Sequence, residues 1–278
     1  MCHVSCVLCH VPCQEVGTNY QPTLRASLEA QGYEGQFLAK ELGTEEGEAT
    51  FWRRGVWRLL EARHLTFNQL LEGAVARAGL ATALAAEVAR DHVVLVTKLE
   101  HRATGRALTV ANLHTIWDDF RQLDVAALHV AMAVRAVAGE GAVVVAGDYN
   151  SLPSMEPYLL ATQGGLTPAQ LEGLRGKGGG VLGEAGPLAT CLAAEFTTPT
   201  LHLASAYKVV RGEEPRLTNF DDYDGSHPAD WCLDYLLYSP AALAPTMVLD
   251  TVGVPEARIP DSTFPSDHLS IKAAFTFL

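Results

Sequence analysis

The sequence predicts an α/β fold, because short apolar runs rich in β-branched residues alternate with longer helical stretches along the chain. The chain has 278 residues, enough for one large α/β domain, and residues 1–278 are expected to form a single domain. Strands are expected at residues 4–13, 93–99, 107–113, 142–147, 201–206, 233–238 and 269–276, and helices at Gln21–Gln31, Phe67–Arg90, Asp118–Ala138, Glu156–Gly164 and Thr167–Leu174.

The strand expected at residues 142–147 ends in Gly147 and is followed by Asp148, Tyr149 and Asn150. Successive side chains of a strand alternate between faces, so Asp148 and Asn150 point the same way. Carboxylate and amide oxygens are ligands that Mg²⁺ prefers. Gly, Asp and Asn also favour turns, so this motif alone supports a turn and a metal site about equally.

Four further segments place polar residues at or inside an expected strand. Asp234 lies within an apolar, aromatic-rich strand, where an unpaired charge would be costly, and a histidine is its natural partner. The other segments carry Gln14 and Glu15 after residues 4–13, Asn112 and His114 at the end of residues 107–113, and Asp267 and His268 before residues 269–276.

Together the motifs Gln-Glu, Asn-x-His, Gly-Asp-x-Asn, Asp-Tyr and Ser-Asp-His, in this order between residues 14 and 268, resemble those of the endonuclease/exonuclease/phosphatase superfamily. Finer features are similar to its branch of poly(A) deadenylases, nocturnin, angel proteins and 2'-phosphodiesterases. These features are residues 46–54 (EGEATFWRR), residues 150–153 with Tyr158 and Gly164, and residues 205–207, 218–220 and 264–266.

The resemblance implies a four-layer sandwich, deoxyribonuclease-I-like, in which two mixed β-sheets pack face to face and helices flank them. Relatives carry an opening strand with a metal-site Asn, and then a helix, before the Gln-Glu strand. Here Gln14 comes almost at once. The chain is therefore expected to be incomplete at its N-terminus, with the first strand missing.

The resemblance also implies hydrolysis of a phosphate ester by a metal-activated water, with Mg²⁺ as the cofactor and Mn²⁺ as the alternative. Expected metal ligands are Glu15, Asp148, Asn150 and Asp267. His268 would act as general base or as transition-state donor, with Asp234 fixing its tautomer. The expected catalytic residues are His268, Asp234, Asp148, Asn150 and His114, the last donating to the phosphate unless it is a structural core histidine.

The favoured function is a 3'-to-5' exoribonuclease of poly(A)-deadenylase type acting on single-stranded RNA, with mRNA-decay proteins as partners. The first alternative is a nucleotide 2'-phosphatase or a cyclic-phosphate or 2'-5' phosphodiesterase. The second is an inactive, truncated scaffold that binds RNA or protein. Expected substrate-binding residues are Asn112, His114, Tyr207, Phe220, Tyr223 and Arg54.

The formal net charge of −12 argues against holding long nucleic acids by diffuse electrostatics, so binding should be local. Candidate phosphate-facing cations are Arg53, Arg54, Lys208 and Arg211, although each is an ordinary surface charge by default. The sequence has no stretch of 18 apolar residues, so no membrane span is expected. The expected location is the cytoplasm, with the nucleus as the alternative.

Cysteines are concentrated at the beginning of the chain. Cys2, Cys6, Cys9 and Cys13, with His3 and His10, are residue types that bind zinc, but their spacing matches no familiar zinc finger. The alternative is that residues 4–13 form the apolar strand that delivers Glu15, with cysteine acting as a small hydrophobe.

Overall fold

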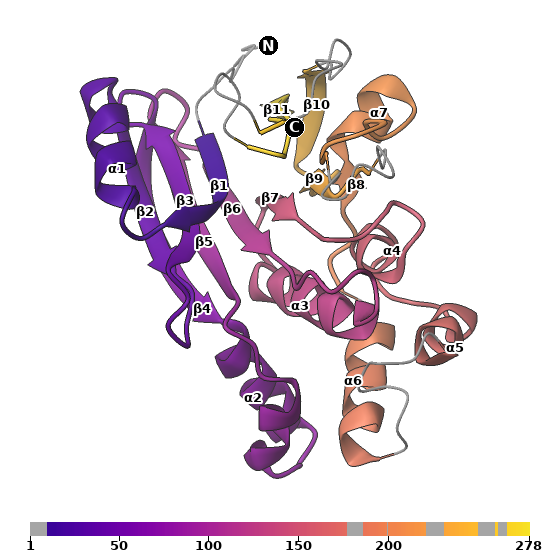
Figure 1. Ribbon diagram of the computed structural model, residues 1–278. Helices are drawn as coiled ribbons and strands as arrows, with labels where there is room; N and C mark the ends of the chain where they lie inside the picture. Colours follow the sequence, from indigo (N-terminus) through magenta and orange to yellow (C-terminus); the bar gives the residue numbers. More distant parts are fainter. Residues whose placement is uncertain (1–9, 177–185, 199, 221–230, 250–258, 261–265) are drawn as a thin grey trace.

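A mixed six-stranded sheet forms the centre of the computed structural model (Figure 1). The structure describes residues 10–176, 186–198, 200–220, 231–249, 259–260 and 266–278. The strands are β4 (Trp57–Thr66), β5 (Val93–His101), β6 (Ala107–His114), β7 (Ala142–Asp148), β8 (Ala204–Ser205) and β9 (Asp234–Tyr238). Their order is β4-β5-β6-β7-β9-β8, and β6 and β7 are the parallel neighbours.

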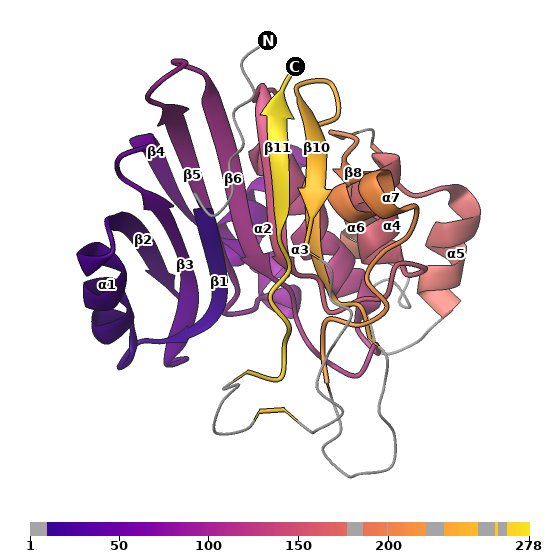
Figure 2. The same cartoon turned by 90° about the horizontal axis from the view of Figure 1, so that it is seen from above.

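Two smaller sheets pack on one face of the six-stranded sheet and lie side by side (Figure 2). The apolar layer between the six-stranded sheet and the two small sheets contains Trp52, Leu99 and Val144 together with Phe275. One small sheet has the order β1-β3-β2 and the other pairs β10 with β11. Their bounds are β1 (His10–Gly17), β2 (Tyr33–Ala39), β3 (Glu46–Arg53), β10 (Leu243–Val248) and β11 (Ala273–Phe277).

Helices cover the outer faces of both layers. On the six-stranded sheet, Val143 and Val145 of β7 pack into the core under helix α3 (Leu123–Ala136), most of which is buried. On the other side, Leu24 and Leu28 of α1 (Gln21–Ala30) pack against the three-stranded sheet. The other helices are α2 (Phe67–Arg77), α4 (Glu156–Gln163), α5 (Pro168–Gly176), α6 (Pro187–Thr197) and α7 (Ala206–Arg211), with a 3-10 helix η1 (Thr82–Val88).

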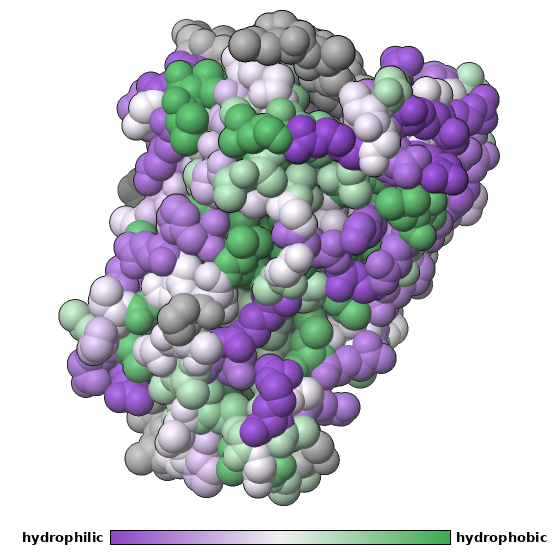
Figure 3. All heavy atoms as spheres, turned by 180° about the vertical axis from the view of Figure 1, so that it is seen from behind, coloured by the Kyte–Doolittle hydropathy of each residue, from purple (hydrophilic) through white to green (hydrophobic). Residues whose placement is uncertain are grey.

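The order helix, sheet, sheet, helix confirms the four-layer α/β sandwich. In the described residues the second sheet layer consists of two separate hydrogen-bonded pieces, because β1 and β11 do not pair with each other. Seen from behind, the surface mixes hydrophilic and hydrophobic residues, and the hydrophobic ones form small separate areas (Figure 3). No helix of the described residues is long and apolar enough to cross a membrane.

The structure corrects four of the expected elements. The strand expected at residues 269–276 begins only at Ala273, as β11. The helix expected at Phe67–Arg90 ends at Arg77, because Gly79 takes a left-handed φ of 70° and turns the chain. The helix expected at Asp118–Ala138 starts only at Leu123, after a loop with left-handed backbone. The strand expected at residues 201–206 is limited to β8, because the side chain of Ser205 caps the helix α7 that follows.

Candidate active site

The register of the six-stranded sheet brings three of the expected catalytic residues into one row. β6 and β7 are parallel, so His114 and Asp148 at their carboxyl ends are direct partners. β9 runs antiparallel to β7, so Asp234 at its start is the partner of Asp148 on the other side. All three side chains are buried, and the row lies where these central strands end.

The turn after β7 depends on a glycine and on an amide. Gly147 has φ 145°, and a Cβ there would lie 1.8 Å from the carbonyl oxygen of Leu113, so only glycine fits. Asn150 has a left-handed φ of 43°, and its backbone N–H donates to Asp148 Oδ1 at 2.7 Å. Its Nδ2 donates to the Thr115 carbonyl at 2.9 Å and lies 3.0 Å from His114 Nε2. The segment is thus a turn, and it places Asp148 and Asn150 together.

Glu15 reaches this row from the opposite sheet. The pairing of β1 with β3 shifts between Cys13 and Val16, so Glu15 sits in a bulge with a left-handed φ of 54°. Its Oε1 lies 3.7 Å from His114 Nδ1. Two of the site's residues, Glu15 and Asn150, therefore have strained backbones, a feature that clusters at functional sites.

His268 completes the site from the C-terminal part of the chain. Its Nδ1 lies 2.8 Å from Asp234 Oδ2, and its Nε2 lies 3.8 Å from Asp148 Oδ2. Asn219 Nδ2 lies 2.8 Å from the same Nε2. The pairing of Asp234 with a histidine, expected from the cost of burying its charge, is present with hydrogen-bonding geometry.

Residues 218–220 hold the two halves of this pair together. Thr218 Oγ1 accepts hydrogen bonds from the backbone N–H groups of Leu233 and Asp234, at 2.9 and 3.1 Å. The Thr218 carbonyl accepts from Leu269 N–H at 2.7 Å, and Phe220 N–H donates to the Asp267 carbonyl at 2.9 Å. We call residues 218–220 the strap, because they fix the start of β9 against the loop that carries His268.

The charges of the site are strongly coupled. Burial and the charge of Asp234 raise the pKa of Asp148. Burial lowers the pKa of His268, but the hydrogen bond and charge of Asp234 and the charge of Asp148 outweigh it and raise the pKa to about 10. Burial and the charge of Lys40 hold the pKa of His114 well below its usual value, so His114 is neutral.

Sequence reasoning missed an ion pair beside Glu15. Lys40 Nζ donates to Glu46 Oε1 at 2.5 Å and lies 3.4 Å from His114 Nδ1, and only 5% of the Lys40 side chain is exposed. Glu46, Glu15 and His114 bring their ligand atoms within 4.8 Å of one another, and so do Asp148, Asp234 and His268. Glu46 opens residues 46–54, a family feature noted in the sequence, whereas Lys40 carried no signal that could place it at the site.

A pocket with a cavity of about 130 Å³ opens at this row and is lined by the segments that carry Glu15, His114, Asp148 and His268, and by the strap, but not by Lys40 or Glu46. Four of its lining residues were not predicted as site residues, namely Asn219, Leu233, Trp117 and Trp231. Asn219 lies inside a motif noted in the sequence, but the two tryptophans carry no titratable chemistry. The expected residues among the lining are Glu15, His114, Asp148, Asn150, Asp267 and His268.

Several residues expected to bind substrate lie elsewhere. Asn112 is fully buried between the two sheets. Its Oδ1 accepts a hydrogen bond from Gln14 Nε2, and its Nδ2 donates to the carbonyls of Cys13 and Ala49. Tyr207 is 2% exposed, and its hydroxyl donates to the Leu249 carbonyl. Neither residue is among those that line the pocket.

The expected phosphate-facing cations also have other places in the fold. Arg54 follows the end of β3 opposite to Glu46, roughly 25 Å along the strand from the site. Arg53 lies over the ring of Tyr33 and Lys208 over the ring of Tyr158. Arg211 is exposed at the end of α7. Phe220 belongs to the strap without lining the pocket, and Tyr223 lies outside the described residues.

The N-terminal cysteines are described only in part, since Cys2, His3, Cys6 and Cys9 lie outside the described residues. Cys13 is on β1, and burial raises the pKa of its thiol to about 11. The strand that delivers Glu15 is present as β1.

The model of the Endonuclease/Exonuclease/phosphatase family matches residues 15–268, which contain every pocket-lining residue named above. The chain belongs to this family.

Other members of the Endonuclease/Exonuclease/phosphatase family match most of this chain. The Ccr4 exoribonuclease subunit of the CCR4-Not complex from Candida albicans is 27% identical over 94% of this chain and 34% of its own length. Mouse 2',5'-phosphodiesterase 12 is 26% identical over 91% of this chain and 40% of its own. The chain thus spans about a third to two fifths of these curated relatives. The crystal structure of ANGEL2, a 2',3'-cyclic phosphatase, superposes with a TM-score of 0.67 at 23% identity, covering 96% of this chain and 80% of that one.

Proposed function

We propose that the chain is a Mg²⁺-dependent phosphodiesterase, and specifically a 3'-to-5' exoribonuclease of poly(A)-deadenylase type. The observation that carries the proposal is the position of His268 between Asp234 and Asp148, with Glu15 and His114 facing the same pocket. The similarity to the Ccr4 exoribonuclease subunit supports the choice of RNA as substrate.

The donor set fits a hard divalent cation. Asp148, Asn150, Asp267 and Glu15 line one pocket, and the oxygen ligands that such side chains offer suit Mg²⁺ and equally Mn²⁺. Burial and the neighbouring charge of Asp234 raise the pKa of Asp148, and a bound cation would offset both effects. When bound, the cation supplies Lewis-acid polarisation of the phosphoryl oxygen and acidification of a water.

His268 serves as the proton donor to the phosphate in this proposal. With a pKa raised to about 10, its imidazole is protonated at neutral pH, and Asp234 accepts the Nδ1 proton. Nε2 lies 2.8 Å from the side-chain amide of Asn219, whose oxygen would accept the Nε2 proton if the amide is flipped. A phosphoryl oxygen on which charge develops would take over this hydrogen bond. A cation bound at Asp148 would lower this pKa toward the range of a general base, so the two roles expected for His268 depend on occupancy of the site.

Donor groups lie beside both ring nitrogens of His114. Asn150 Nδ2 is 3.0 Å from Nε2 and Lys40 Nζ is 3.4 Å from Nδ1, and a neutral imidazole can accept at only one of the two. The shorter contact, with Asn150, favours the proton on Nδ1. In this proposal Nδ1–H would donate to a phosphate oxygen held beside Glu15 and Lys40.

The runner-up function is a nucleotide 2'-phosphatase or a cyclic-phosphate or 2'-5' phosphodiesterase. It is favoured by the similarity to 2',5'-phosphodiesterase 12 and by the fold shared with a 2',3'-cyclic phosphatase. The same metal-binding residues would serve both activities, and the loops would select between them.

The test is Mg²⁺-dependent shortening of a 5'-labelled oligoadenylate, run beside a 2'-5'-linked oligoadenylate and a 2'-phosphorylated nucleotide. We expect a ladder of products shortened from the 3' end, abolished by Asp148→Asn. Glu195→Gln is the matched control, because Glu195 is a buried carboxylate paired with Arg135 away from the pocket. Turnover of only the 2'-linked or 2'-phosphorylated substrates would move the assignment to the runner-up. Folded protein that is silent on all of them would favour the scaffold.

A further inference from the structure

Two tryptophans form the rim of the active-site pocket. Trp117 lies in the loop after β6, and Trp231 lies just before β9. β6 and β9 are the two neighbours of β7, so the tryptophans approach Asp148 from either side. Their ring centroids are 5.5 Å apart with an interplanar angle of 49°, and both rings line the pocket.

Trp117 is 41% exposed, although the fold can bury a tryptophan. Trp52 and Trp57 are each 2% exposed and belong to the layer between the sheets. A large aromatic side chain left in water beside a catalytic pocket gives up the free energy of burial. Exposed apolar surface at such a place marks a ligand-binding site.

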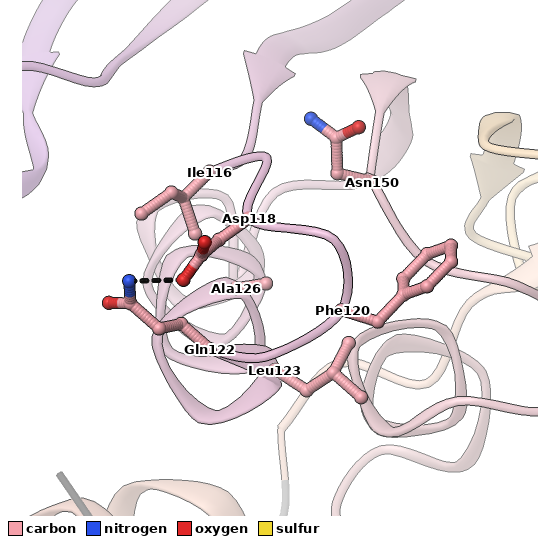
Figure 4. A pocket seen from close by; sticks show the side chains of 7 residues that line it. All are labelled: Ile116, Asp118, Phe120, Gln122, Leu123, Ala126 and Asn150. Carbon is pink, nitrogen blue, oxygen red and sulfur yellow. Dashed lines mark hydrogen bonds between the residues drawn. The ribbon is translucent and has the colours of Figure 1, made fainter. Parts of the chain in front are cut away.

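A third ring supports the pair from behind. Phe120 lies 5.3 Å from Trp117 and 5.4 Å from Trp231, in edge-to-face geometry with both. Asp119 and Phe120 have consecutive left-handed φ angles of 49° and 59°, which are costly for residues other than glycine. Figure 4 shows how the loop is held, with Asp118 accepting from Gln122 Nε2 at 2.5 Å while Phe120 points to the other side. The strained loop thus fixes the rim.

The chemistry of the pocket limits what this rim can bind. Glu15, Asp148 and Asp267 make the lining acidic, and the whole chain carries a net charge of −12. Additional phosphate groups would therefore add little affinity in this pocket. A neutral planar ring is compatible with the acidic lining, and base stacking on aromatic side chains is tolerant of sequence because every base has a π-face.

We propose that Trp117 and Trp231 stack on the base of the nucleotide whose phosphate is attacked, so that the substrates are nucleotides or polynucleotides and not phosphate esters without a base. The reaction part of this proposal rests on the proposed function. The rim is expected to require a base without strongly selecting which base it is.

The catalytic test compares two oligonucleotides that differ only in the 3'-terminal residue, adenosine in one and an abasic ribose in the other. The wild-type protein is expected to favour the adenosine end in kcat/KM by about 5- to 150-fold. Trp117→Leu and Trp231→Leu should each remove most of that preference by slowing the adenosine substrate alone, and Trp117→Phe should restore part of it. Equal loss on both substrates would mean that the tryptophans only support the fold, and equal turnover by wild type would exclude a base site.

A binding measurement separates this proposal from the proposed function. With metal removed by a chelator, adenosine 5'-monophosphate should quench tryptophan fluorescence, while ribose 5-phosphate should not. The quenching should fall in Trp117→Leu and persist in Leu60→Ala, a control at an exposed apolar residue of the edge strand β4. Base-dependent quenching without any hydrolysis would keep the rim and overturn the exonuclease assignment. Equal quenching by both compounds, or none, would overturn the rim.

Discussion

Asp148 and Asp234 are direct partners across the antiparallel pair β7 and β9, and both are buried. Two carboxylates held side by side in a low-dielectric edge of the sheet repel each other, and His268 is the cation that lies between them. The arrangement is unfavourable for stability and useful for binding a divalent cation.

Asp148→Asn is expected to stabilise the metal-free protein by about 1–2 kcal/mol while abolishing hydrolysis, because it removes one buried carboxylate. Denaturant unfolding with chelator measures the first effect, and the oligoadenylate assay measures the second. Mg²⁺ should raise the melting temperature of the wild type and leave that of the variant unchanged. If Asp148→Asn were less stable than the wild type without metal, the repulsion between Asp148 and Asp234 would be contradicted.

Asp234→Asn is expected to lower kcat on the order of 10³-fold, because an amide cannot hold His268 in its protonated form and fixed orientation. The same variant should lower the pKa of His268 in the metal-free protein, measured by NMR titration of the imidazole. Glu195→Gln serves again as control and should keep full activity. Retention of more than a tenth of the wild-type kcat would show that the pair has no catalytic part.

Glu48 allows a prediction on pH and stability. It is fully buried on β3 with neither carboxyl oxygen hydrogen-bonded within the described residues, and burial holds its pKa well above the ordinary value. An acid whose pKa is raised on folding binds more protons folded than unfolded, so it lowers stability as pH rises above its unfolded value.

Glu48→Gln should therefore be more stable than wild type at pH 8, by at least about 1 kcal/mol, with the difference vanishing at pH 4. Glutamine keeps the shape and the unsatisfied polar group, so the comparison isolates ionisation. Urea unfolding at the two pH values measures it. A gain of the same size at both values would point to packing instead.

Gly147→Ala should destabilise the fold by more than about 3 kcal/mol, since its Cβ would overlap the Leu113 carbonyl and its φ of 145° suits glycine. Gly141→Ala, just before the same strand, is the matched control, because its Cβ would meet no atom within 4 Å. We expect that control to change stability by no more than about 0.5 kcal/mol. Thermal unfolding of both variants measures the difference. Equal melting temperatures would contradict the predicted overlap between a Cβ at position 147 and the Leu113 carbonyl.

The sequence predicted those parts of the fold that local patterns encode. Apolar runs located β5, β6 and β7 to within a residue or two. Asp148 and Asn150 lie together as expected, but a turn with a left-handed Asn150 brings them together and not the alternation of a strand. The cost of burying a charge linked Asp234 to a histidine, and the structure supplies His268. Each of these inferences needs only neighbours in the chain.

Other parts depend on three-dimensional contacts that no local pattern records. The row of His114, Asp148 and Asp234 follows from register, which needs the strand order. Lys40 and Trp117 joined the site because loops from other strands end there, and their residue types carried no signal of it. Arg54 matched a family feature, but it falls at the wrong end of its strand.

One amide sets the spacing between the two sheets beneath the site. Asn112 on β6 donates to the carbonyls of Cys13 on β1 and Ala49 on β3. These hydrogen bonds fix the distance between the sheet that carries Asp148 and the sheet that carries Glu15. Substitutions in the apolar layer between the sheets, even distant ones, would alter that spacing and with it the distance between Glu15 and Asp148. Substitutions that change the packing of this core would therefore also change the geometry of the site. For such variants the affinity for divalent cations should be measured together with the free energy of unfolding.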